Sequence, residues 1–164
     1  MSYDLRFVPH NPGQDWEETL AAAEESFGRD RPVGGDLADT WDRLVDRCRP
    51  LLDGPVELYL TREFRELSDE GTGITLTLFP TEAGLTAPYG HGEPKRLIAT
   101  MFALAQVVQE ETGWRGFDPQ LGVGLDEVRA GVVETQYTTG PGGDDRSSMR
   151  FVQQWTTFGD VVEP

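Results

Sequence analysis

The sequence predicts an α+β fold, a two-layer sandwich in which a mainly antiparallel sheet carries helices on one face. Strand patterns and helix patterns come in blocks along the 164 residues, and this order favours an antiparallel sheet over a doubly wound parallel one. A hydrophobic fraction of 37% over this length provides for one core, because chains divide into domains mainly above about 250 residues. A ferredoxin-like plait is one topology that fits the order.

The first third of the chain predicts a strand followed by two helices. Residues 2–8 alternate between apolar and polar side chains, which is typical of a half-buried strand. Asp15 forms a capping-box pattern with Glu18, and apolar residues then recur at helical spacing. Asp36 is the expected N-cap of a second helix, whose apolar side chains fall within one narrow arc. Cys48 belongs to that arc, so we expect it to be a small buried side chain.

The middle of the chain predicts three strands. Residues 56–61 and 74–79 alternate like antiparallel strands, the second with threonines on one side and aliphatic side chains on the other. Residues 85–89 form the third strand, and Pro88 places it at a sheet edge or ends it. Residues 62–67 fit either a continuation of the first of these strands or a helical turn, and the pattern leaves both open.

The clearest helix covers residues 93–112. Pro94 suits its first turn, and Gly113 stands where a C-terminal cap is expected. Its apolar positions form a broad face: Leu97, Ile98, Met101, Phe102, Leu104, Ala105 and Val108. We expect this helix to lie across the sheet at the centre of the core.

The remainder predicts one short strand and a C-terminal extension. Residues 114–117 read as a strand that Asp118 and Pro119 close, and residues 120–124 as a loop. We assign residues 1–124 to the core domain and 125–164 to a β extension of that domain, with strands at 132–139 and 149–158. The aromatic side chains of the extension, Phe151, Trp155 and Phe158, either cover the domain's own sheet or pair with a second copy.

Composition excludes several classes of function. The net charge is -15 and acidic residues outnumber basic ones in every third of the chain, so we expect neither nucleic acids nor anionic membranes as partners. One cysteine and two histidines exclude an internal disulfide and a Cys/His zinc site. Because no secretory signal opens the sequence and its longest apolar stretch is too short for a membrane span, we expect a cytoplasmic protein.

Recognised catalytic and cofactor motifs are absent from the sequence. It contains no Walker loop, dinucleotide-binding glycine fingerprint, nucleophile elbow, zinc-protease motif or EF-hand loop. We therefore predict no catalytic residues, no metal and no cofactor. The acidic side chains Asp39, Asp42 and Asp46 fall on the outer face of the second predicted helix, where carboxylates are usually solvated, and Asp39 can pair with Arg43.

The best candidate ligand site is the start of the long helix. His91, Lys95 and Arg96 lie within its first turns, where exposed backbone N–H groups attract a carboxylate or phosphate. Tyr89 and Asp118 are candidate neighbours, since Asp118 can supply a polar contact beside aromatic walls. The competing interpretation is structural: the glycines around His91 make a turn, the basic pair meets nearby acids, and Asp118 sets a turn through local amides.

Two short segments resemble a group of small bacterial proteins of unknown function, of the kind found in actinobacteria. They are the opening Met-Ser-Tyr-Asp-Leu-x-Phe, residues 1–7, and the Thr-Gly-x-x-x-x-Asp-Pro-Gln segment, residues 112–120. The resemblance covers residues 1–122 in layout. It implies a compact α+β fold and gives no activity.

Two functions follow as hypotheses. The first is a non-enzymatic interaction protein that neutralises a basic partner, as an immunity protein or antitoxin does, or that associates with itself; an acidic surface speeds encounter with basic proteins but also serves plain solubility. The second is a binder of, or an enzyme acting on, an anionic small molecule at the residue 89–96 helix start. The sequence favours the first.

Overall fold

The computed structural model describes residues 2–27, 31–88 and 93–127 and has the predicted α+β architecture. Its elements in chain order are β1 (Ser2–Val8), α1 (Trp16–Phe27), α2 (Gly35–Cys48), the 3-10 helix η1 (Arg49–Leu51), β2 (Val56–Leu60), β3 (Arg65–Asp69), β4 (Thr75–Leu78), β5 (Ala83–Pro88), α3 (Pro94–Thr112), β6 (Arg115–Asp118), β7 (Val123–Gly124) and the 3-10 helix η2 (Leu125–Glu127).

The strands form one seven-stranded antiparallel sheet in the order β2-β3-β4-β5-β1-β6-β7. β2 to β5 follow one another as a meander, whereas β1 is inserted between β5 and β6 and pairs with both. Because β5 and β6 are both antiparallel to β1, they run parallel to each other with α3 as their connection. This is the split βαβ arrangement of a ferredoxin-like plait, here widened by the additional strands at its margins.

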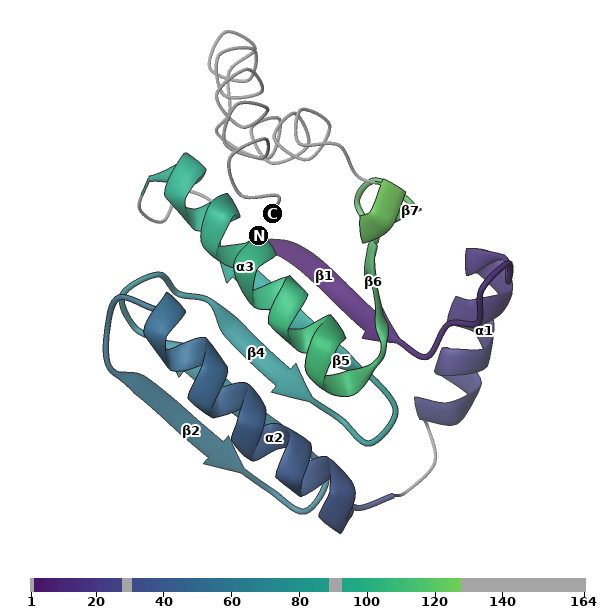
Figure 1. Ribbon diagram of the computed structural model, residues 1–164, viewed down its shortest axis with the longest axis horizontal. Helices are drawn as coiled ribbons and strands as arrows, with labels where there is room; N and C mark the ends of the chain where they lie inside the picture. The colour runs from purple at the N-terminus through teal and green to yellow at the C-terminus, as the bar shows by residue number, and fades with distance from the viewer. Residues whose placement is uncertain (1, 28–30, 89–92, 128–164) are drawn as a thin grey trace, which may run out of the picture.

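The core lies between the sheet and the two helices α2 and α3, which lie side by side on one face (Figure 1). Tyr3, Leu5 and Phe7 of β1 point to this layer and are at most 2% exposed. The helix α3 supplies the largest buried set, namely Leu97, Ile98, Met101, Leu104, Ala105, Val107 and Val108. The predicted central helix is thus confirmed, and Gly113 ends it in the left-handed conformation (φ 72°) that glycine adopts without strain.

Salt bridges join α2 to α3 on the solvent side of the helical layer. Arg43 contacts Glu111 at 2.9 Å, and Arg47 contacts Glu110 at 2.6 Å and Glu111 at 3.0 Å. Hydrogen bonds from these arginines lower the pKa of both glutamates below the usual carboxyl value. Arg43 therefore pairs across the helix interface, and the predicted contact with Asp39 on its own helix is replaced.

The opposite face of the sheet is polar over β3, β4 and β5. Thr75 and Thr77 alternate with the buried Leu76 and Leu78, as the sequence pattern predicts. At the other margin α1 packs beside β1 and β6: Trp16 contacts Phe117 with ring centroids 5.0 Å apart. Figure 1 shows α1 standing apart from the layer of α2 and α3.

The helices α1 and α2 both differ in detail from the prediction. The helix α2 begins at Gly35 with Gly34 as N-cap, and no side-chain hydrogen bond caps it. Asp36 is therefore an acidic residue inside the first turn, where it is favourable to the helix dipole, and the prediction of Asp36 as N-cap was wrong. In α1 the expected apolar residue Phe27 is 48% exposed, while Thr19 is buried and lies 2.8 Å from the His10 ring.

The segment that the sequence left ambiguous is a separate strand. Thr61 and Phe64 close a tight turn, in which the Thr61 N–H donates to the Phe64 carbonyl and the Thr61 hydroxyl accepts from the Phe64 N–H. The chain then returns as β3, so this region holds four strands instead of three. The expectation of a loop at residues 120–124 is also corrected, because β7 pairs there with β6. The strands predicted at 132–139 and 149–158 lie outside the described residues.

We expect truncation of a core side chain in β1 to destabilise the fold. Leu5→Ala removes a side chain that is 2% exposed and should lower the free energy of unfolding by about 2–5 kcal/mol in urea denaturation. Leu51→Ala is the control, since Leu51 is 38% exposed and the same change there should cost less than about 1 kcal/mol. Equal losses at both positions would contradict the core described above.

Candidate functional site

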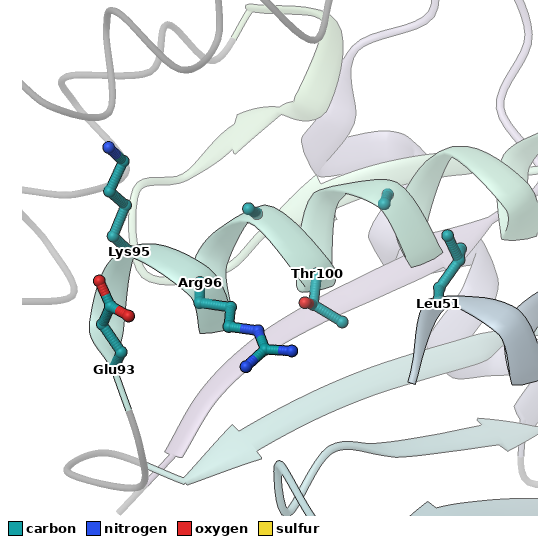
Figure 2. Close-up of a pocket in the computed structure, with 7 residues that line it drawn as sticks. Leu51, Glu93, Lys95, Arg96 and Thr100 are labelled. Atoms are coloured by element: carbon teal, nitrogen blue, oxygen red, sulfur yellow. The ribbon is translucent and has the colours of Figure 1, made fainter. Parts of the chain in front are cut away.

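The start of α3 carries the predicted basic pair over a shallow hollow. The hollow has a volume of about 410 Å³ and is lined by Leu51, Glu93, Lys95, Arg96, Ala99, Thr100 and Ala103. Figure 2 shows Arg96 on the same side of α3 as Thr100, while the Lys95 ammonium points away from the Arg96 guanidinium. Lys95 and Arg96 thus line one hollow but do not converge on a single point in it.

One of the two basic side chains at this hollow is already paired. Arg96 forms an ion pair with Asp53 at 2.5 Å, and Glu93 lies two residues before Lys95 in the sequence. Among the described residues Lys95 is the cation here without such a pair. Tyr89 and His91, the other predicted members of the site, lie outside the described residues. An incoming anion would therefore meet one unpaired ammonium group and the first amides of α3.

Asp118 is a buried turn residue, as the structural interpretation of its motif expects. Its side chain is 0% exposed, accepts the Tyr3 hydroxyl, and accepts the backbone N–H groups of Gln120 at 2.9 Å and Leu121 at 3.1 Å. Burial raises the pKa of Asp118 above the ordinary carboxyl value, and the Tyr3 and backbone hydrogen bonds oppose that shift. Asp118 does not line the hollow at Lys95, so the structure does not bring these two predicted residues into one pocket.

The other candidate chemical groups do not form a site in the described part of the chain. Asp39, Asp42 and Asp46 are exposed on α2, as predicted. Within residues 2–27, 31–88 and 93–127 there is no group of three His, Cys, Asp or Glu side chains placed to hold a metal ion, and no helix is long and apolar enough to cross a membrane. Cys48 is 0% exposed, as predicted, and burial raises the pKa of its thiol to about 12.

Among residues 2–27, 31–88 and 93–127, the large apolar side chains with the greatest exposure gather on the edge strand β2. Leu58, Tyr59 and Leu60 are 40%, 60% and 59% exposed, and they are consecutive on a strand that, among the described strands, pairs with β3 alone. We call these three residues with Val56 and Glu57 the β2 edge. The alternation of residues 56–61 predicts a half-buried strand and does not by itself mark a binding edge. The available signal was a run of three large apolar residues at the end of an otherwise alternating strand, which one buried face does not explain.

A row of four aromatic rings begins at the β2 edge. Tyr59 contacts Phe64 at 5.7 Å between ring centroids, Phe64 contacts Phe79 at 5.8 Å, and Phe79 contacts Phe27 of α1 at 5.1 Å. The two terminal rings, Tyr59 and Phe27, are 60% and 48% exposed. The row therefore extends the apolar surface from the sheet edge towards α1.

Comparison with known proteins adds no family to this geometry. No protein-family model, curated protein or solved structure matches the chain. The resemblance carried by residues 1–7 and 112–120 stays a prediction.

We expect Asp118 to give the protein a measurable pH dependence. Because its pKa is raised in the folded state, the free energy of unfolding should fall as the pH rises from the ordinary carboxyl value through the raised one. Asp118→Asn keeps an oxygen for the backbone N–H groups and has no proton to lose. It should therefore gain stability relative to the wild type as the pH rises above the ordinary carboxyl pKa, measured by urea denaturation at several pH values.

A second variant tests the role of the hydroxyl. Tyr3→Phe removes the hydrogen bond that favours the ionised carboxylate and should extend the fall in stability to higher pH. Identical pH slopes in the wild type, Asp118→Asn and Tyr3→Phe would refute this assignment.

Proposed function

We propose that this chain is a non-catalytic protein-interaction module whose binding surface is the β2 edge. The observation that carries the proposal is the exposure of Leu58, Tyr59 and Leu60 on a strand whose outer side pairs with no other described strand. Such a strand presents free backbone N–H and C=O groups, which bind an extended segment of another protein by adding a strand to the sheet. Exposed apolar side chains on the same strand supply the contact area that backbone bonds lack.

Within the part of the chain that the structure describes, the β2 edge has none of the usual protection against strand addition. Natural edges are shielded by lysine, by proline within the strand, by a bulge or by a covering segment. Residues 56–60 contain one charge, Glu57, and neither lysine nor proline, and their pairing with β3 is regular from Val56 to Leu60. An exposed apolar edge that lacks these devices supports a role in binding.

Two kinds of partner fit this edge. A net charge of -15 accelerates encounter with a basic protein, which fits an immunity protein or antitoxin that neutralises a basic toxin. Strand addition also serves self-association, because an edge that accepts a foreign strand accepts its own copy. Both partners use the same surface.

We expect a lysine on this edge to abolish binding. Leu58→Lys should reduce capture of partner proteins by the immobilised chain at least about tenfold, because it places a charge in the centre of the contact. Leu51→Lys is the matched control: Leu51 is 38% exposed, close to the 40% of Leu58, and lies at the hollow of α3. Equal capture by the wild type and Leu58→Lys would refute the proposed surface.

The second candidate function is the binding of a small anion at the start of α3. Its support is the hollow of about 410 Å³ lined by Lys95 and the first turns of the helix. Inorganic phosphate at about ten times its dissociation constant should then raise the melting temperature by about 3 °C. Lys95→Ala should abolish this shift, whereas Arg62→Ala, at an exposed position in the turn after β2, should keep it. An unchanged melting temperature would reject this function.

A further inference from the structure

The hydrogen-bond pattern of β2 decides which of its backbone groups are free. In an antiparallel pair every second residue bonds to the neighbouring strand, and the residues between them point their N–H and C=O groups away from it. The Thr61 N–H donates to the Phe64 carbonyl, so Thr61 is a bonded position. Counting back in steps of two along the register, Tyr59 bonds to Glu66 and Glu57 to Ser68. Val56, Leu58 and Leu60 therefore direct their backbone groups outward.

This outward set is complementary to itself. If two β2 strands meet antiparallel about a two-fold axis through Leu58, then Leu58 faces the partner's Leu58, and Val56 faces the partner's Leu60. Each outward residue then meets an outward residue, and each pair exchanges two backbone hydrogen bonds. A shift of the axis to Glu57 or Tyr59 shortens this ladder, so the arrangement centred on Leu58 satisfies the most backbone groups.

The side chains agree with the same register. On the helix-facing side, the leucines and valines of both strands meet. This contact covers Leu58 and Leu60, which are 40% and 59% exposed. On the other side, Glu57 faces Tyr59 of the partner subunit, an aromatic residue with a hydroxyl that can donate to the carboxylate. An axis through Glu57 would instead place two carboxylates opposite each other, which is unfavourable.

We propose that a second copy of this chain occupies the β2 edge and that two sheets join into one continuous sheet about a two-fold axis at Leu58. The proposal rests on the binding surface proposed above and names its occupant. The net charge of -15 opposes association, but charges separated by more than about 8–10 Å are screened at physiological salt, and Glu57 is the one charge on the strand itself. A single strand pair is a small interface, so a dissociation constant in the range of about 1–100 μM is expected.

Sedimentation velocity over a range of concentrations tests the dimer. The wild type should pass from monomer to dimer in the micromolar range, Leu58→Lys should stay monomeric, and Leu51→Lys should behave like the wild type. A monomeric wild type up to about 500 μM, or a Leu58→Lys variant that still dimerises with unchanged affinity, would overturn the proposal.

Cysteine cross-linking tests the register. Cysteines at position 58 face each other in a bonded pair with Cα atoms about 5.5 Å apart, within the range of a disulfide. Cysteines at position 59 are diagonal neighbours about 7–8 Å apart, beyond that range. Leu58→Cys should therefore give a covalent dimer under mild oxidation much faster than Tyr59→Cys, although Tyr59 is the more exposed residue. The native Cys48 is buried and does not compete.

The outcomes separate this inference from the proposed function. A wild type that is monomeric but captures another protein, and loses it with Leu58→Lys, overturns the dimer and leaves the binding surface in place. Faster cross-linking of Tyr59→Cys than of Leu58→Cys also overturns the register. A chain that neither dimerises nor captures any protein through this edge refutes both.

Discussion

The rest of the structure depends on one constraint: the sheet is wider than the layer of helices that covers it. Seven strands about 4.8 Å apart span about 29 Å, whereas two packed helices cover about 20 Å. The layer of α2 and α3 therefore cannot cover both margins. At one margin, Leu125 of η2 packs against the core beside Gly116 of β6. At the other margin β2 is left with its leucines in solvent, so the exposed edge follows from the dimensions of the fold.

Most of the described charged and nucleophilic side chains that the sequence offers for ligand binding or catalysis are occupied by contacts within the fold. Arg96 is neutralised by Asp53, and Asp118 is held by Tyr3 and by the amides of its own turn. The Cys48 thiol lies on the core-facing side of α2, and its raised pKa keeps it protonated at neutral pH. The charged and nucleophilic side chains that the structure describes are thus solvated, paired or buried. Among the described residues, the exposed large apolar side chains gather mainly on β2.

Much of the fold could be predicted because local patterns report burial directly. Tyr3, Leu5 and Phe7 alternate along β1, and the apolar residues of α3 recur every three or four positions, as elements with one buried face require. The predictions that failed depended on contacts between elements. Asp36 has the chemistry of an N-cap, but the N-cap is Gly34, two residues earlier. Arg43 pairs with Glu111 on another helix instead of with its neighbour Asp39.

The sequence by itself determined the class of fold, the central helix and the turn at Asp118, because side-chain periodicity and local hydrogen bonding act within a few residues. Only the tertiary structure decided that residues 65–69 are a strand, that Lys95 and Asp118 do not share a pocket, and that β2 lies at the sheet margin. The sequence pattern of residues 56–60 fits an inner strand as well as an edge strand. Which strand is left without a neighbour depends on the order of the whole sheet, and that order is fixed by long-range packing.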